Sequence, residues 1–314
     1  MKALLLDSNH DVLHETLEAA GITCTKAWNW TQQDLLKALP EFEIIVLRSR
    51  LTFNENLLNT CKSLKIIARV GAGMEAIDTR FANSKGIYCL SVPEGNRDAV
   101  AEHALGMLLM LLNKLHTAHS EVCQGIWKRA ENRGTELNSL SVGIVGFGNT
   151  GQRFSALLKG FGCKQYIVDP YQKPSPNSGL QTLSISDLTQ VADVVSLHIP
   201  YNSETHYIIN DAFIHRMKNP FYLINTSRGA CADTGALVRG LKSGKIRGLC
   251  LDVIEYEAVD FNSNQSIHSE QYDFLKRDAR VVMSPHIAGW THESNYKMSR
   301  GIALKIIEAL KNPA

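Results

Sequence analysis

Short apolar runs alternate with amphipathic stretches through the first hundred residues. Four of these runs have the length of buried strands, with helix-length sequence between most of them: 3–6, 43–47, 64–70 and 87–90. Strands that alternate with helices favour parallel βαβ units. A second series of such runs follows later in the chain: 141–145, 165–168, 193–198, 221–225 and 247–251. The pattern therefore predicts an α/β protein with two doubly wound parallel sheets.

Two further stretches have the apolar content of helices. Residues 99–116 are apolar almost without interruption, which predicts one long helix that is buried on nearly every side, between domains or between subunits. Residues 291–311 carry apolar side chains at a spacing that suits a terminal helix packed on one side. The segments 170–178 and 262–269 are the most loop-like, and we expect both to flank a ligand cleft.

Composition narrows the class of protein. A chain of 314 residues with 44% hydrophobic and 20% charged residues is typical of a globular protein with two domains. Its net charge of +2 is too small to attract nucleic acid or anionic lipid over a whole surface. The longest apolar run, 104–112, is far shorter than the ~20 residues that span a bilayer. The first residues lack a secretory signal, and seven scattered cysteines without a C-x-x-C pair indicate reduced thiols, so we expect a cytoplasmic protein.

A glycine motif follows the first strand of the second series. Gly146, Gly148 and Gly151 form G-x-G-x-x-G between that strand and a helical stretch, which is the context of a dinucleotide-binding turn. The first glycine permits a tight turn, the second lets backbone N–H groups approach a pyrophosphate, and the third lets helix and strand pack closely. We expect the whole turn to bind the cofactor: Gly146, Phe147, Gly148, Asn149, Thr150 and Gly151.

A carboxylate ends the next predicted strand. Asp169 occupies the place where such folds bind the ribose hydroxyls of the cofactor. A negative charge there repels a 2′-phosphate, which favours NAD over NADP. Lys173 lies close enough in sequence to leave NADP as an alternative.

Three more strands end in residues suited to acid–base chemistry. Arg228 follows the strand 221–225, Asp252 and Glu257 follow the strand 247–251, and His286 follows the apolar run at 280–283. Ligands of open α/β sheets bind at the carboxyl ends of the strands, so we expect these side chains to face one crevice. The guanidinium of Arg228 is suited to a bidentate interaction, with two parallel hydrogen bonds, to a carboxylate.

The ordered motifs of this chain resemble those of the D-isomer-specific 2-hydroxyacid dehydrogenases, and within them the 3-phosphoglycerate dehydrogenases. The resemblance rests on the glycine turn and on four further motifs: Ser196-Leu-His-Ile-Pro200, Asn225-Thr-Ser-Arg-Gly229, Gly248-Leu-Cys-Leu-Asp-Val253 and Pro285-His-Ile-Ala-Gly289. It implies a central Rossmann NAD domain, residues 98–289, inserted in a flavodoxin-like substrate domain made of residues 1–97 and 290–314. The terminal helix would then return to the first domain.

The resemblance also assigns roles to individual residues. It implies that Arg228, Glu257 and His286 are catalytic. His286 would take the proton of the 2-hydroxyl while hydride leaves C2 for the nicotinamide, and Glu257 would orient the imidazole and favour its protonated form. Arg228 would hold the substrate carboxylate and polarise the C2 oxygen. The matching motifs add further cofactor-binding residues: His198, Pro200, Thr226, Asp252 and His286.

Several histidines have less specific interpretations. His198 is better explained as a structural histidine at a strand end than as a catalytic partner. The pairs His10/His14 and His116/His119 have helical ligand spacing but no third ligand nearby, so we predict no metal site. Ala258 stands where the family usually has a proline, directly after Glu257.

Basic residues in the first half of the chain bear on the substrate. Residues 48–50 repeat an Arg-Ser-Arg pattern of the 3-phosphoglycerate dehydrogenases, and a phosphate dianion needs such clustered donors. The resemblance implies this set of substrate-binding residues: Arg48, Ser49, Arg50, Arg69, Gly71, Ala72, Gly73, Asn96 and, reaching a neighbouring subunit, Arg129. The expected substrate is then 3-phosphoglycerate, at the first step of serine biosynthesis. Solvated surface arginines are the alternative interpretation.

Two other functions share this motif set. A hydroxypyruvate or glyoxylate reductase would keep every catalytic residue but need no phosphate site, and a corepressor-type protein would bind NAD with little turnover. The apolar stretch 99–116 fits a two-fold interface, so we expect a homodimer. The chain ends at Ala314, where longer members carry regulatory domains, and we therefore predict no serine feedback through such a domain.

Overall fold

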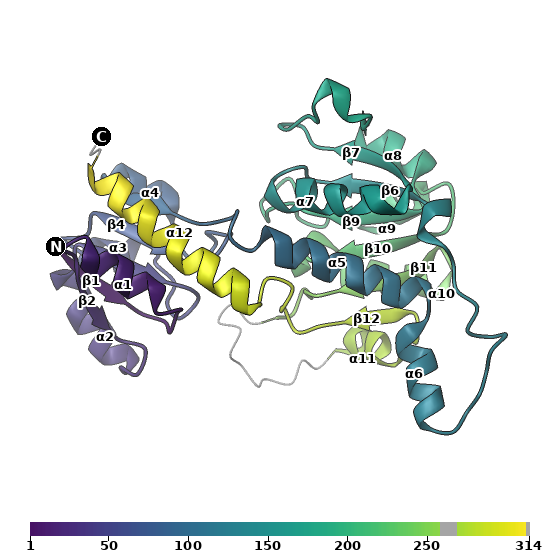
Figure 1. The fold of residues 1–314 in the computed structure, drawn as a ribbon, viewed down its shortest axis with the longest axis horizontal. Coiled ribbons are helices and arrows are strands. Elements are labelled where there is room, and N and C mark those ends of the chain that lie inside the picture. The colour runs from purple at the N-terminus through teal and green to yellow at the C-terminus, as the bar shows by residue number, and fades with distance from the viewer. Residues whose placement is uncertain (258–268, 312–314) are drawn as a thin grey trace. The chain divides into compact units, whose positions relative to one another are not determined.

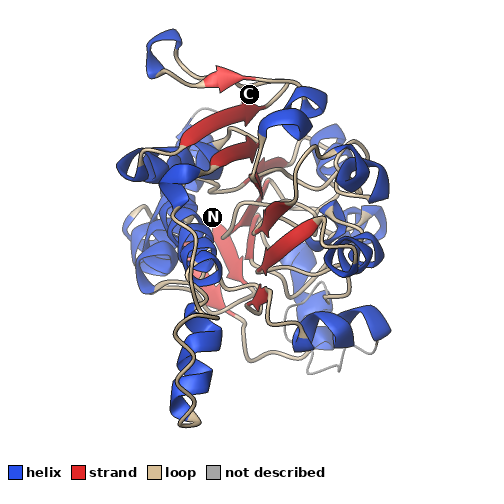
Figure 2. Ribbon diagram, turned by 90° about the vertical axis from the view of Figure 1, so that its right-hand side faces the viewer, coloured by secondary structure: helices blue, strands red, loops and turns tan. Residues whose placement is uncertain are grey.

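The computed structural model describes residues 1–257 and 269–311. Contacts divide these residues into two units, each with its own sheet. The terminal unit comprises Met1–Asn96 together with the chain from Trp290 onward, and the central unit comprises Arg97–Glu257 together with residues 269–289. Each sheet is entirely parallel, as the alternating sequence pattern predicts (Figures 1 and 2).

The terminal unit has a five-stranded sheet in the order β2-β1-β3-β4-β5, which is the flavodoxin-like order. Its strands are β1 (Lys2–Leu5), β2 (Thr23–Lys26), β3 (Ile44–Leu47), β4 (Ile66–Arg69) and β5 (Tyr88–Leu90). The four predicted strands correspond to β1, β3, β4 and β5. The edge strand β2 is missed because its sequence, TCTK, is polar and half-exposed and therefore shows no apolar run.

Six helices belong to the terminal unit: α1 (Val12–Ala19), α2 (Gln32–Ala38), α3 (Glu55–Thr60), α4 (Thr79–Ser84), the 3-10 turn η1 (Leu39–Glu41) and α12 (His292–Lys311). Three of them begin at a side-chain cap, in which Thr31, Asn54 and Asp78 accept a backbone N–H of the first turn. The last helix, α12, runs along α1 (Figure 1). Its buried face completes the cluster that covers one side of the sheet.

The central unit has a seven-stranded sheet in the order β12-β11-β10-β9-β6-β7-β8. Its strands are β6 (Ser141–Val145), β7 (Lys164–Val168), β8 (Gln181–Thr182), β9 (Val194–Leu197), β10 (Phe221–Asn225), β11 (Ile246–Leu251) and β12 (Val281–Met283). The order reverses at β6, which lies between β7 and β9, as in the Rossmann fold. The very short edge strand β8 is not predicted by the pattern.

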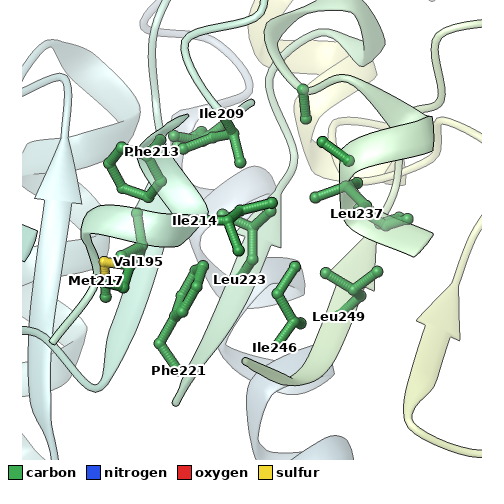
Figure 3. Close-up of a cluster of buried hydrophobic side chains, with 14 of the residues drawn as sticks. Val195, Ile209, Phe213, Ile214, Met217, Phe221, Leu223, Leu237, Ile246 and Leu249 are labelled. Carbon is green, nitrogen blue, oxygen red and sulfur yellow. The ribbon is translucent and has the colours of Figure 1, made fainter. Parts of the chain in front are cut away.

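Helices cover the central sheet on both faces. They are α5 (Arg97–Leu112), α6 (Leu115–Cys123), α7 (Asn149–Leu158), α8 (Ile185–Val191), α9 (Asp211–Arg216), α10 (Thr234–Lys242) and α11 (Glu270–Arg277), with 3-10 turns η2 (Leu137–Ser139), η3 (Lys159–Phe161), η4 (Pro176–Ser178) and η5 (Gly229–Cys231). Alternate residues of β10 enter opposite clusters: Leu223 packs with α9 and α10 (Figure 3), and Ile224 packs on the other face. Burial on both faces explains why the strands are continuous apolar runs.

The predicted single helix over 99–116 is wrong at its end. Helix α5 ends at Leu112, Lys114 has a left-handed backbone with φ of +53°, and α6 begins at Leu115. The carbonyl of Leu112 accepts the N–H of Thr135 at 3.0 Å, so a distant segment replaces the helical bond that would continue α5. The apolar pattern resumes at Leu115, which is why the break is invisible in the sequence.

The two predicted loops have different outcomes. Residues 170–178 are a loop that ends in the 3-10 turn η4. The segment 262–269 lies outside the described residues apart from Ser269, which caps α11.

Among the helices of the described chain, none has the length and apolar content needed to cross a membrane.

Candidate active site

The three predicted catalytic residues follow neighbouring strands of the central sheet. Arg228 comes shortly after β10, Glu257 after β11, and His286 after β12, and these strands are adjacent in the order β12-β11-β10. Because the strands are parallel, their carboxyl ends meet at one edge. The fold therefore brings the three loops to the same edge of the sheet.

His286 and Glu257 are hydrogen-bond partners. Nδ1 of His286 lies 2.9 Å from Oε2 of Glu257, and both side chains are about three-quarters buried. The backbone of His286 is left-handed, with φ of +55°, which is rare for a residue with a side chain. Because Nδ1 faces Glu257, Nε2 is the ring nitrogen that the predicted proton exchange with a substrate would use.

The loop that carries His286 is held by the buried carboxylate of Asp252. Its Oδ1 accepts the Ser284 hydroxyl at 2.6 Å and the Ile287 N–H at 2.9 Å, and its Oδ2 accepts the Ala288 N–H at 2.8 Å. The Asp252 carbonyl accepts the N–H of His286 at 2.7 Å. Asp252, which the resemblance assigns to the cofactor, therefore positions the loop of His286 in this structure.

Sequence reasoning missed two members of this network. Ser284 lies 2.8 Å from Nε2 of His103, a residue of α5 that also lies 3.6 Å from Oδ1 of Asp252. Ser284 directly precedes Pro285 and His286, and this adjacency in sequence could have identified it as part of the site. His103 had no such signal, because it lies inside the apolar stretch of α5 and far from the motif in sequence.

The loop of Arg228 is braced by small polar groups. The Ser227 hydroxyl donates to the Leu197 carbonyl at 2.7 Å, and the Asn225 amide donates to the Arg228 carbonyl at 3.0 Å. Gly229 has no room for a side chain, since a Cβ there would lie 2.0 Å from the carbonyl of Ile254. This glycine lets the arginine loop and the glutamate loop approach at backbone distance.

The glycine turn has the shape that a dinucleotide requires. Gly146 has φ of +93°, and a Cβ on it would lie 2.2 Å from the His198 carbonyl. A Cβ on Gly151 would lie 2.0 Å from the Gly146 carbonyl, so this glycine permits close packing of helix and strand. In contrast, a Cβ on Gly148 would meet nothing within 4 Å in the described chain. This open side of the turn, at the N-terminus of α7, is where backbone N–H groups can receive a pyrophosphate.

Asp169 follows β7 and shapes the turn that it faces. Its Oδ2 accepts the Phe147 N–H at 2.6 Å, and its Oδ1 accepts the N–H groups of Tyr171 and Gln172, both at 2.8 Å. A carboxylate has about four acceptor positions, so one remains to receive a ribose hydroxyl. The charge at this position fits NAD.

Other predicted cofactor residues lie along the same edge. The hydroxyl of Thr226 and Nδ1 of His198 are buried and have no hydrogen-bond partner among the described residues. Unpartnered buried groups at this edge fit a polar ligand. Asn149 and Thr150 open helix α7, and Pro200 is exposed after β9.

His198 has the environment of a structural histidine. Burial lowers its pKa to about 3, so the ring is neutral at physiological pH. Its Nε2 lies 2.9 Å from the Ser196 hydroxyl, and the ring packs against Phe154 at 5.0 Å between centroids. The ring is thus held by packing and by Ser196, while its Nδ1 has no partner among the described residues.

Arg50 is committed to backbone groups of the terminal unit. Its guanidinium donates to the carbonyls of Leu6 at 3.0 Å, of Ala27 at 2.7 Å, and of Trp30. These carbonyls follow the ends of β1 and β2. The side chain that resembles a phosphate ligand therefore joins two loops of its own domain.

Arg48 has a different environment. Its guanidinium stacks 4.3 Å above the ring of Trp290 and lies 3.5 Å from the Asn295 side-chain oxygen, while its backbone N–H donates to Asp7 at 2.7 Å. Burial lowers the pKa of Arg48. The charge of Arg48 also interacts with the carboxylate of Asp7. This half-buried guanidinium is suited to an anion.

The remaining predicted substrate residues fall into two places. Arg69 donates to the Arg48 carbonyl at 2.9 Å and to the Gly73 carbonyl, and lies 3.4 Å from Glu75, so it shapes the loop 71–73. The terminal unit also contains Ser49, Gly71, Ala72 and Asn96. The side-chain oxygen of Asn96 is buried and has no hydrogen-bond partner among the described residues. Arg129 is exposed after α6 in the central unit. The described residues contain no cluster of His, Cys, Asp or Glu that could hold a metal ion.

The substitution Gly148→Ala tests the cofactor turn without disturbing the fold. The added methyl contacts no protein atom but occupies the open side of the turn, so we expect the Kd for NADH to rise at least tenfold while Tm stays unchanged. Fluorescence titration and thermal unfolding measure the two quantities. Gly160→Ala, which also adds a methyl in open space, is the matched control. Equal NADH affinity in both variants would contradict the assignment.

The comparisons with known proteins agree with this geometry. The family description "D-isomer specific 2-hydroxyacid dehydrogenase, NAD binding domain" matches residues 105–288. D-3-phosphoglycerate dehydrogenase of Sus scrofa is 28% identical over 99% of this chain, and the match covers 56% of that longer protein. Hydroxypyruvate reductase of Thermotoga maritima is 32% identical over 89% of this chain and 88% of its own length.

A solved structure extends the match to the whole fold. The D-lactate dehydrogenase of Aquifex aeolicus, in complex with NAD and lactic acid, superposes with a TM-score of 0.84 at 29% identity. The superposition covers 99% of this chain and 95% of the other. The glycine turn, the carboxylate after β7 and the matched NAD-binding domain together define the cofactor as NAD. The chain belongs to the D-isomer-specific 2-hydroxyacid dehydrogenase family.

Proposed function

We propose that this chain interconverts a D-2-hydroxy acid and its 2-keto acid, and that its substrate is 3-phosphoglycerate. The observation that carries the reaction is the His286–Glu257 pair at the carboxyl edge of the NAD-binding sheet. The observation that favours a phosphorylated acid is the half-buried guanidinium of Arg48, which stacks on Trp290.

The residues divide the chemistry among them. NAD, when bound, accepts the hydride that leaves C2 of the hydroxy acid. His286 removes the proton of the C2 hydroxyl through Nε2, and in the reverse direction it returns that proton to the carbonyl oxygen. Glu257 holds the ring by Nδ1 and stabilises the imidazolium that forms. Arg228 binds the substrate carboxylate and places C2 for reaction.

The substitution Asp252→Asn tests whether the buried carboxylate positions His286. An amide group replaces one acceptor oxygen with a donor, so at least one of the N–H groups of Ile287 and Ala288 loses its partner. We expect a loss of about 2–3 kcal/mol in the free energy of unfolding and a fall in kcat of at least tenfold. Urea unfolding and initial rates measure both.

The control for this variant is Asp187→Asn, which removes the charge of an exposed carboxylate in the same unit. It should leave kcat unchanged. If Asp252→Asn kept wild-type kcat, Asp252 would not position His286.

A second candidate activity is the reduction of hydroxypyruvate or glyoxylate. It is favoured by the side chain of Arg50, which binds three backbone carbonyls, and by that of Arg69, which shapes the loop 71–73. The phosphate proposal therefore depends on Arg48 in the terminal unit. In this reductase, the same three catalytic residues would act on an unphosphorylated acid.

The substrate is tested by NADH oxidation with 3-phosphohydroxypyruvate, hydroxypyruvate and glyoxylate side by side. We expect the phosphorylated acid to be preferred, and Arg48→Ala to lower its kcat/KM by about 10- to 100-fold, because charge-assisted bonds are lost. The other two acids should be unaffected by this change. Arg80→Ala, an exposed arginine of α4, is the control.

The other results of this assay identify different proteins. Preference of the wild type for hydroxypyruvate or glyoxylate would establish the reductase. NADH binding without turnover of any of the three acids would establish a binding protein of the corepressor type.

We propose that the protein is a homodimer that pairs through α6 and the outer side of α5. Helices α5 and α6 expose Met110, Leu115 and Val122, and the loop after α6 exposes Trp127, with 81% of its area accessible. An apolar surface of this kind on a monomer is characteristic of an interface.

All seven cysteines are free thiols, which supports a reducing compartment such as the cytoplasm.

The double substitution Leu115→Glu with Trp127→Glu places charge on this surface. We expect light scattering after size exclusion to show a monomer, whereas wild type gives a dimer. Leu304→Glu, on the exposed side of α12, should leave the dimer intact. A wild-type monomer, or a dimer that persists in the double variant, would refute the interface.

A further inference from the structure

Tyr207 lies in a short segment that runs beside the loop of Arg228. Its N–H donates to the Ala230 carbonyl at 2.9 Å, and the N–H of Ile209 donates to the Cys231 carbonyl at 3.1 Å. The backbone of Tyr207 is left-handed, with φ of +49°. A bulky residue keeps such a conformation only where its surroundings require it, and these residues concentrate at functional sites.

The Tyr207 side chain reaches the loop of Glu257. Its hydroxyl donates to Oε1 of Glu255, and Oε2 of Glu255 accepts the N–H of Thr234, the first residue of α10, at 3.1 Å. The ring is stacked on that of His206 at 3.9 Å between centroids. The hydrogen bond to this carboxylate raises the pKa of Tyr207 to about 12, so the hydroxyl remains a donor at physiological pH.

Glu255 is anchored two residues before the catalytic glutamate. The N–H of Glu257 turns back to the carbonyl of Ile254 at 3.3 Å, so the loop 254–257 is a single turn with Glu255 inside it. The peptide between Ile254 and Glu255 lies against Gly229, next to Arg228. The segment of Tyr207 thus contacts the arginine loop through its backbone and the glutamate loop through its side chain.

We propose that Tyr207 is a positioning residue that, through Glu255, holds the loop of Glu257 in register with the loop of Arg228. This inference rests on the proposed roles of Arg228, Glu257 and His286. The action of Tyr207 and Glu255 is to fix the position of the carboxylate that pairs with His286.

The test compares Tyr207→Phe with wild type, and repeats the comparison in an enzyme that already carries Glu257→Gln. We expect Tyr207→Phe to lower kcat about tenfold, with the Kd for NADH and Tm unchanged. In the Glu257→Gln background the same change should have no further effect, because no carboxylate remains to be positioned. Tyr201→Phe removes a hydroxyl from the same loop region and is the control with unchanged kcat.

A second variant distinguishes a positioning effect from a folding defect. Glu255→Gln keeps the size of the side chain but weakens both anchoring bonds, and should reproduce the kcat loss without adding to that of Tyr207→Phe. If Tyr207→Phe has wild-type kcat, or if its effect multiplies with that of Glu257→Gln, the inference is overturned while the proposed function stands. If wild type turns over none of the three acids, the proposed function and this inference fall together.

Discussion

The hydrogen bonds of Asp252 connect the ends of two neighbouring strands, and the geometry of the site depends on them. Asp252 begins the loop after β11, and its carboxylate accepts three hydrogen bonds from the loop after β12. Because this carboxylate is almost completely buried, each of those bonds is worth more than it would be in water. His286 can therefore keep a left-handed backbone and present its ring to Glu257.

The same principle operates at the other loops of the sheet edge. Asn225 and Asp169 bond backbone groups of the arginine loop and the glycine turn. Ser227 and Glu255, which lie in such loops, bond backbone groups of β9 and α10. Glycine contributes in the opposite way, since Gly229, Gly146 and Gly151 allow backbones to approach where a methyl could not fit. The chemistry thus sits on short loops whose conformation is determined by buried polar contacts.

The sequence predicts most strands because a strand buried on both faces is a continuous apolar run, as in β3 and β10. It misses β2 and β8, whose edge positions leave their residues polar, and it misses the break at Lys114, where the apolar pattern continues across a left-handed turn. Motif spacing locates Arg228, Glu257 and His286 at strand ends. It does not show that Arg50 would bind backbone carbonyls or that His103 would reach Ser284, because such partners are created only by the tertiary fold.

The return of α12 to the terminal unit affects the order in which the chain can be completed during translation. The sheet face formed by Ala3, Leu5, Val46 and their neighbours is covered by Met298, Ile302 and Ile306. On a ribosome, those side chains emerge only after the whole central unit has been made. At a translation rate of ~5–20 residues per second, this sheet face stays uncovered for ~10–40 s. The terminal unit therefore matures last, although most of it is synthesised first, and during that interval its uncovered apolar face is the surface that a chaperone would bind.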